Sequence, residues 1–431
     1  MRNTFNACIS WLAIAAASTL TLPLAAPADA KATAHDGIAY IEEDTTETDT
    51  ATADTIISEE DLPWPMNVQS RIGRLLDNDM FTTSVVGLMV YDLTADSTLI
   101  AHGEKLLLRP ASTLKTVVAI TALDRLGTDY QYTTRLAYTG EKNSTTLHGD
   151  IYCIGGFDPA FSSSDLGDFA DSIAALGIDT IKGAMYADLS MKDDDRLGEG
   201  WCWDDDNPVL SPLLVGRKDE FAERLVKLLA RRGIVVEEGT RQGETPHSAQ
   251  VFATLQRPVK TILRRMLKKS DNLYSESLFY QLARAARPSS PATAKRGRQE
   301  ISRLMTKIGL KPSRYYIADG SGLSLYNYVS AELETRFLRY AYHHGDIYAA
   351  LTEALPIAGD DGTLDDRMRR GYAKGNVHAK TGTLMGISSL AGYCTAANGH
   401  VLCFAIINSG IRHTSSAHRF QDKVCEALCR P

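Results

Sequence analysis

The fold of this chain is decided by one short stretch, Arg109-Pro110-Ala111-Ser112-Thr113-Leu114-Lys115-Thr116. Pro110 has a fixed φ that suits the first turn of a helix, and the apolar residues after it predict a helix to Leu126. Ser112 is therefore expected at the N-terminal end of that helix, where backbone N–H groups lack partners. Lys115 follows three residues later, so its amine returns to the same face. A serine with an amine beside it is the arrangement of an acylating nucleophile.

Two later motifs support a catalytic role for Ser112 and Lys115. Ser270-Asp271-Asn272 is predicted between a helix ending at Lys269 and one starting near Leu273, where a helix cap is the alternative explanation. Lys380-Thr381-Gly382-Thr383 is predicted on the strand 377–384, where an edge-strand turn with one exposed lysine is the alternative. The ordered trio Ser-x-x-Lys, Ser-x-Asn, Lys-Thr-Gly resembles the signature of penicillin-binding proteins and serine β-lactamases.

The residue types of the trio suit acyl transfer. Ser112 can attack a carbonyl carbon if Lys115 removes its proton, which requires a lowered lysine pKa. Burial or a neighbouring cation lowers such a pKa, and Lys380 can supply that cation. Ser270 can pass a proton between the leaving amine and the lysines.

The same motifs contain candidate groups for substrate binding. The Asn272 amide can hold a peptide group, and Lys380 with the Thr383 hydroxyl suits a C-terminal carboxylate. The backbone N–H groups of Ser112 and Thr383 can form an oxyanion hole. Gly382 lets the strand approach the substrate closely. The predicted substrate-binding positions on this strand are Thr381, Gly382 and Thr383.

Further stretches narrow the resemblance to one family. From about Leu62 almost to its C-terminus the chain resembles class C low-molecular-mass penicillin-binding proteins, the D-alanyl-D-alanine carboxypeptidase/endopeptidase family. The matching stretches are Arg109–Ser112, Gly200–Asp205, Lys268–Asn272, Asp319–Ser324, Ala358–Leu364 and Ala379–Leu384.

This resemblance implies the α+β DD-peptidase/serine β-lactamase fold, in which an antiparallel sheet packs with helices beside an all-helical lobe. The implied function is that of a serine D-alanyl-D-alanine carboxypeptidase acting on peptidoglycan stem peptides through an acyl-enzyme on Ser112. Covalent inhibition by β-lactam antibiotics is expected, and endopeptidase action is left open. No cofactor is expected.

The long interval between Ser112 and Ser270 leaves room for an insertion. We expect a catalytic domain of residues 62–138 and 250–431 and an inserted mixed α/β subdomain of residues 139–249. Gly216 leads almost directly into a helix at Asp219, so the insertion is shorter than in related chains. In that family an aromatic and acidic patch on the insertion helps to bind a free amino group of the stem peptide. Its counterparts here are Trp201, Asp204 and Asp205; the alternative is that the tryptophans are core residues and the acids are solvated.

Two other readings of the trio are weaker. Class A β-lactamases use a Glu-x-x-x-Asn loop between the second and third motifs, and no glutamate there is followed by asparagine four residues later. Deacylation is therefore expected to be slow, so that penicillin inhibits more than it is destroyed. A non-catalytic peptidoglycan-binding protein of the same fold is disfavoured because no catalytic position is replaced.

The N-terminal residues predict that the protein is exported. Arg2, the largely apolar segment 9–26 and Ala28-Asp29-Ala30 predict a secretory signal peptide of residues 1–30, cleaved after Ala30, with an uncleaved anchor as the alternative. Export to the periplasm or beyond follows. Residues 31–61 read as an acidic, disordered spacer, since 36–61 hold ten acidic residues and neither lysine nor arginine. The formal net charge is −7, and without this spacer the chain is near neutral. The charge therefore gives no indication of nucleic-acid binding.

Cysteines supply one further expectation. If Asn398-Gly399 forms a two-residue hairpin turn, Cys394 lies opposite Cys403, either as a disulfide or as two buried thiols. Cys425 and Cys429 are expected to face a core. No Cys/His spacing resembles a metal site.

Overall fold

The computed structural model describes residues 62–203 and 207–431. The predicted signal peptide, the spacer 31–61, Asp204 and Asp205 lie outside these residues. Within the described ranges, no helix has the length and apolar character needed to cross a bilayer.

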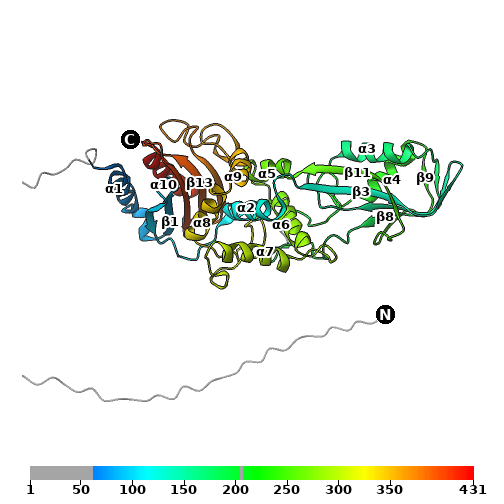
Figure 1. The fold of residues 1–431 in the computed structure, drawn as a ribbon, viewed down its shortest axis with the longest axis horizontal. Helices are drawn as coiled ribbons and strands as arrows, with labels where there is room; N and C mark the ends of the chain where they lie inside the picture. Colours follow the sequence, from blue (N-terminus) through cyan, green and yellow to red (C-terminus); the bar gives the residue numbers. More distant parts are fainter. Residues whose placement is uncertain (1–61, 204–206) are drawn as a thin grey trace, which may run out of the picture. The chain divides into compact units, whose positions relative to one another are not determined.

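A five-stranded antiparallel sheet forms the first part of the fold, with the strand order β12-β13-β14-β1-β2. The helices α1 and α10 cover one face, and α8 covers the other (Figure 1). The bounds are β1 Val85–Asp92, β2 Ser97–His102, β12 His378–Leu384, β13 Ile387–Thr395, β14 Val401–Ser409, α1 Trp64–Leu76, α8 Ala331–Tyr342 and α10 Thr414–Cys429.

Burial on both faces explains the sequence of the central strands. Along β14, Leu402, Phe404 and Ile406 pack in the core beneath α10, whereas Cys403 and Ile407 pack in the core beneath α8. Such strands read as nearly continuous apolar runs rather than as an alternation. This is why β13 and β14 could be predicted from the sequence.

The predicted opposition of Cys394 and Cys403 is wrong. Cys403 pairs with Tyr393, and Cys394 pairs with Leu402, because the turn has three residues, with Gly399 at a φ of 85°. A one-residue change of register moves a side chain to the other face of a sheet. Cys394 therefore lies in the core with Cys425 and Cys429, and the six cysteines among the described residues are free thiols. Cys425 and Cys429 face a core, as predicted.

The helical lobe is built around α2 (Leu114–Leu126), whose residues from Leu114 to Leu123 are all buried. A helix with no polar face belongs in the centre of a lobe. The lobe around it comprises α5 Val259–Lys268, α6 Asn272–Ala286, α7 Ala294–Lys307 and α9 Gly345–Ala354.

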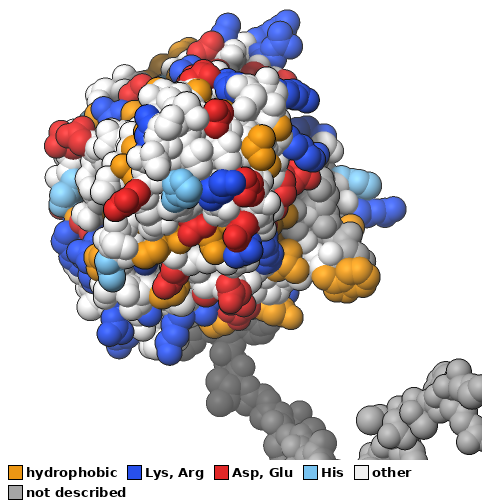
Figure 2. All heavy atoms as spheres, turned by 90° about the vertical axis from the view of Figure 1, so that its right-hand side faces the viewer, with side chains coloured by type: hydrophobic (Ala, Val, Ile, Leu, Met, Phe, Trp, Pro, Cys, Tyr) orange, Lys and Arg blue, Asp and Glu red, His pale blue; other side chains and the backbone are white. Residues whose placement is uncertain are grey.

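The described residues of the insertion form two sheets and two helices. One sheet has the order β10-β8-β6-β3-β11 and the other the order β4-β5-β7-β9. On the face viewed in Figure 2, basic and acidic side chains are interspersed. The bounds are β3 Gln131–Tyr138, β4 Glu141–Asn143, β5 Thr146–His148, β6 Ile151–Ile154, α3 Ser163–Ala174, β7 Thr180–Ile181, β8 Met185–Asp188, α4 Phe221–Arg231, β9 Val235–Val236, β10 Thr240–Gln242 and β11 Gln250–Pro258.

The expected boundaries of the insertion, residues 139 and 249, would separate β3 and β11 from the other strands of their sheet, β6, β8 and β10. Strands β3 and β11 pair along their lengths, from Gln131 with Pro258 to Tyr138 with Gln250. Both strands belong to the five-stranded sheet that also contains β6, β8 and β10. We propose that the insertion spans residues 131–258.

Candidate active site

Ser112 lies in a single 3₁₀ turn, η3 (Ala111–Thr113), which leads directly into α2. Pro110 precedes the turn, as the sequence predicts for the start of a helix. The Ser112 side chain is half-buried, and its Oγ accepts a hydrogen bond of 2.9 Å from Lys115 Nζ. The serine and the amine thus meet across one turn, as their spacing predicts.

Lys115 is fully buried, and its Nζ also donates to Asn272 Oδ1 at 2.8 Å and to the Ser321 carbonyl at 2.6 Å. The amine therefore joins the first motif, the second motif and a loop that follows α7. Burial lowers the pKa of Lys115 to about 8, while the Asp319 and Glu276 carboxylates oppose that shift. A lysine with such a pKa supplies a neutral amine near pH 8.

Lys380 is also buried, and its Nζ donates to the Thr381 carbonyl at 2.7 Å. Burial lowers the pKa of Lys380 well below its usual value, and the neighbouring Lys115 lowers it further. The low pKa of Lys115 was predicted to come from burial or from Lys380. Burial is the cause, and the charge of Lys115 acts on Lys380.

The second motif forms the junction between α5 and α6. Ser270 has a φ of 57°, a left-handed conformation that is rare for serine and recurs at functional sites. The Asp271 carboxylate makes no cap bond to α6; it accepts from Arg217 Nη1 at 2.7 Å and Arg265 Nε at 2.9 Å. Asn272 is thereby held at the start of α6 beside Lys115. Among the described residues, no hydrogen bond joins the Ser270 side chain to Ser112, Lys115 or Lys380.

The third motif lies on the edge strand β12, next to the nucleophile turn. A Cβ on Gly382 would lie 2.1 Å from Ser389 Oγ, 2.7 Å from the Pro110 carbonyl oxygen and 2.9 Å from Ser112 N. The glycine therefore lets β12 pack against the turn that carries Ser112. Thr381 Oγ1 lies 2.7 Å from Thr363 Oγ1, and Thr383 is exposed.

The predicted site does not include two buried carboxylates beside Lys115, those of Glu276 and Asp319. Glu276 is one helical turn after Asn272, and both of its oxygens accept from Gly320 N, at 3.0 and 3.1 Å. Burial and the neighbouring Asp319 raise the pKa of Glu276 to about 8. The spacing of four residues on a helix places Glu276 on the face of Asn272, which is a signal that could have found it.

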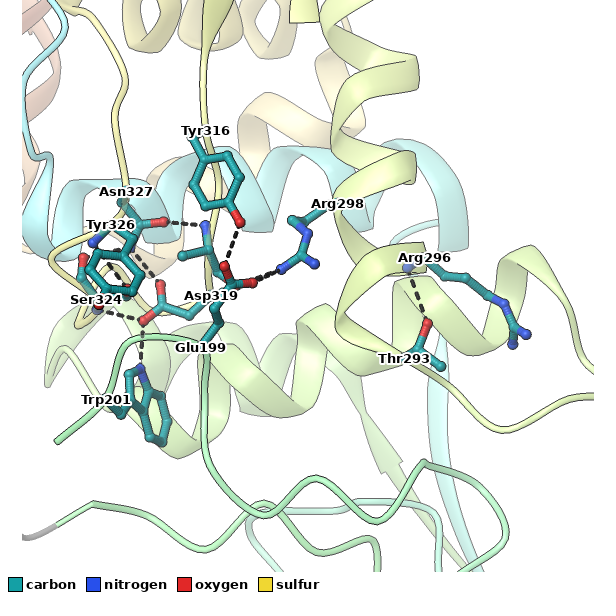
Figure 3. A network of polar contacts seen from close by, with 12 residues as sticks. Glu199, Trp201, Thr293, Arg296, Arg298, Tyr316, Asp319, Ser324, Tyr326 and Asn327 are labelled. Atoms are coloured by element: carbon teal, nitrogen blue, oxygen red, sulfur yellow. Dashed lines mark hydrogen bonds and ion pairs between the residues drawn. The ribbon is translucent and has the colours of Figure 1, made fainter. Parts of the chain in front are cut away.

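The predicted patch on the insertion is only partly described. Trp201 is half-buried and donates from Nε1 to Asp319 Oδ2 at 2.8 Å (Figure 3), whereas Trp203 is 85% exposed. Asp204 and Asp205 lie outside the described residues. Within residues 62–203 and 207–431, no group of three or more His, Cys, Asp or Glu side chains is arranged to hold a metal ion.

A third buried acid lies behind the nucleophile. Glu334, on α8, accepts through Oε1 from Thr113 Oγ1 at 2.6 Å, and its Oε2 is buried without a partner in the described structure. Thr113 Oγ1 also lies 2.8 Å from the Pro110 carbonyl oxygen, so the acid supports the turn of Ser112 from beneath. Its neighbours at helical spacing, Ala331 and Leu338, are buried core residues. An acid on an apolar helix face is the sequence signal for it.

We expect Glu334→Gln to gain stability relative to the wild type as the pH rises. Burial raises the pKa of Glu334 from 4.5 to about 8. Between these values the unfolded chain releases the proton and the folded protein keeps it, so wild-type stability is lost as the pH rises toward 8. The difference grows by up to about 1.4 kcal/mol per pH unit. Thermal unfolding at pH 5 and pH 8 measures it, and a difference that stays constant would contradict a neutral buried Glu334.

Comparison with known proteins agrees with this geometry. The sequence profile of the D-Ala-D-Ala carboxypeptidase 3 (S13) family matches residues 68–215 and 213–428. A D-alanyl-D-alanine carboxypeptidase of Actinomadura sp. is 26% identical over 440 residues, covering 79% of this chain and 80% of the relative.

Solved structures show the fold. Penicillin-binding protein 4 of Haemophilus influenzae superposes with a TM-score of 0.75 at 22% identity, covering 82% of this chain and 97% of its own. The same protein has been solved in complex with a β-lactam. A predatory peptidoglycan endopeptidase of Bdellovibrio bacteriovorus has a TM-score of 0.54 at 19% identity, covering 78% and 91%. The predicted DD-peptidase fold with its sheet and helical lobe is confirmed.

Proposed function

The chain belongs to the D-Ala-D-Ala carboxypeptidase 3 (S13) family and is a D-alanyl-D-alanine carboxypeptidase, and we propose that Ser112 is its nucleophile. The observation that supports this assignment is the convergence of three elements on one amine. Lys115 Nζ bonds Ser112 Oγ, Asn272 Oδ1 and the Ser321 carbonyl within 2.6 to 2.9 Å. A lysine amine buried against a serine hydroxyl is typical of a site of proton transfer, because burial lowers the pKa of the amine.

Substrate binding uses the groups that flank Ser112. The exposed Thr383 hydroxyl and Lys380, on β12, bind the C-terminal carboxylate of the stem peptide. The amide of Asn272 holds the peptide group on the other side of the nucleophile. The backbone N–H groups of Ser112 and Thr383 bind the carbonyl oxygen, on which negative charge develops in the transition state.

Acylation follows from the Lys115 contact. The neutral amine takes the Ser112 proton while Oγ forms a bond to the carbonyl carbon of the penultimate D-alanine. The C–N bond to the terminal D-alanine then breaks, and its nitrogen receives a proton that Ser270 passes from Lys115. Water then attacks the acyl carbon while Lys115 takes a proton from it, and Lys115 gives that proton to Ser112 Oγ as the ester bond breaks. A β-lactam follows the first step only, since its opened ring stays attached to the enzyme.

The peptide specificity is tested with defined muropeptides. Pentapeptide monomers and cross-linked dimers are incubated with the wild type and with Ser112→Ala. The masses of the products are then measured by mass spectrometry. We expect the wild type to remove one alanine from the monomer and Ser112→Ala to remove none. Splitting of dimers by the wild type would add endopeptidase action, which the shortened insertion leaves open.

Labelling with penicillin separates this function from its rivals. We expect a stable adduct on the wild type and none on Ser112→Ala, and labelling of the variant would contradict the nucleophile assignment. Rapid loss of the adduct in an intact-mass time course would favour a β-lactamase. Failure both to bind penicillin and to release D-alanine would favour a non-catalytic peptidoglycan-binding protein. We propose that the enzyme acts after export, in the periplasm or beyond, where its substrate lies.

A further inference from the structure

A short segment of the insertion, Gly198–Trp201, lies against the loop that carries Asp319 (Figure 3). Its first contact is made by Glu199, which accepts from Arg298 Nη1 at 2.8 Å and from the Tyr316 hydroxyl. Arg298 Nη1 also donates to the Ala318 carbonyl at 3.1 Å. Two side chains of the helical lobe thus hold the segment at one end.

The second contact is a close approach of backbone. Gly200 has a φ of 77°, and a Cβ on it would lie 2.6 Å from Ser324 Oγ and 2.7 Å from the ring of Tyr326. Only glycine allows both this conformation and this spacing. The segment is therefore seated on residues 324–326 and does not merely pass over them.

The third contact is the hydrogen bond of 2.8 Å from Trp201 Nε1 to Asp319 Oδ2. Asp319 is 1% exposed, and its carboxylate also accepts from Gly322 N at 2.8 Å, Ser324 N at 2.7 Å and Asn327 Nδ2 at 2.8 Å. One buried carboxylate thus folds the loop 319–324 around itself. Trp201 is the only donor to it that comes from the insertion within the described residues.

This loop reaches the catalytic pair. The Ser321 carbonyl accepts from Lys115 Nζ at 2.6 Å, and a Cβ on Gly322 would lie 1.9 Å from the Ala111 carbonyl oxygen. The loop therefore contacts both the base and the turn of the nucleophile. A change in its position changes the distance between Lys115 and Ser112.

We propose that Trp201 is a positioning residue that sets Lys115 through Asp319 and the loop 319–324, an inference that rests on the proposed function of Lys115. The insertion thereby holds the catalytic base and does more than contact substrate. The indole N–H of Trp201 is used within the protein, so this group is not free to bind a stem peptide.

The test compares Trp201→Phe with Trp203→Phe. The first keeps an aromatic ring and removes the N–H that Asp319 accepts, while the second changes an exposed tryptophan two residues away. We expect Trp201→Phe to slow acylation by penicillin about 10-fold and to lower kcat for D-alanine release, with little change in KM. Trp203→Phe should match the wild type. In an Asp319→Asn background, Trp201→Phe should have no further effect.

Hydrogen exchange gives a readout independent of activity. The amides of Gly322 and Ser324, which Asp319 binds, should exchange faster in Trp201→Phe than in Trp203→Phe. Acylation at the wild-type rate with a raised KM would overturn the proposal, because it would place Trp201 against substrate. Equal exchange and equal rates in both variants would overturn it too. Failure of the proposed function is distinct, since the wild type itself would then neither bind penicillin nor release D-alanine.

Discussion

Lys115→Met is expected to lower the rate of acylation by penicillin roughly 1,000-fold, because a general base contributes about 10² to 10⁴ to a reaction. Methionine has a similar length and fills the buried space, but it cannot accept the Ser112 proton. It also removes the donor to Asn272 Oδ1 and the Ser321 carbonyl. Intact-mass measurement of the adduct against time gives the rate.

The control for this variant is Lys192→Met. The Lys192 side chain is also fully buried, but its amine bonds Asp193 and lies 4.6 Å from the ring centre of Tyr280. We expect this second variant to lose stability and to keep its acylation rate once folded. If Lys115→Met were labelled as fast as the wild type, Lys115 would not be the base.

The catalytic motifs could be predicted because their chemistry is local. Ser112 and Lys115 meet across a single helical turn, so their spacing alone implies the contact. The strands β13 and β14 could be predicted because burial on both faces leaves a long apolar run. The fold was inferred from the resemblance of the three ordered motifs to those of penicillin-binding proteins and serine β-lactamases.

What could not be predicted depends on contacts between distant segments. The register of β13 and β14 was missed because the choice between a two-residue and a three-residue turn decides it, and Gly399 suits both. The contact of Trp201 with Asp319 could not be predicted because nothing in the sequence ties together two residues that lie more than a hundred positions apart. The wider bounds that we propose for the insertion could not be inferred from the sequence, because β3 and β11 pair only in the folded chain.

Gly382→Ala is expected to slow acylation by penicillin at least about 100-fold, since a misplacement of about 1 Å at a reacting group can cost that much. The new Cβ would lie 2.1 Å from Ser389 Oγ, 2.7 Å from the Pro110 carbonyl oxygen and 2.9 Å from Ser112 N. Ser389 can turn away, but the other two atoms are backbone. Relief therefore requires β12 to separate from the turn that carries Ser112, which pulls apart the two proposed oxyanion donors.

Two further variants distinguish this mechanism from a general loss of stability. In the double variant Gly382→Ala with Ser389→Ala the nearest contact is gone, yet acylation should stay slow because the backbone contacts remain. Gly167→Ala places a methyl group on α3 with no atom within 4 Å, so it should keep the wild-type rate and gain about 0.5 to 1 kcal/mol of stability. Wild-type labelling of Gly382→Ala, or full rescue by Ser389→Ala, would show that the strand does not need to lie so close to the nucleophile. The glycine of the third motif would then serve the substrate alone, as its sequence context first suggested.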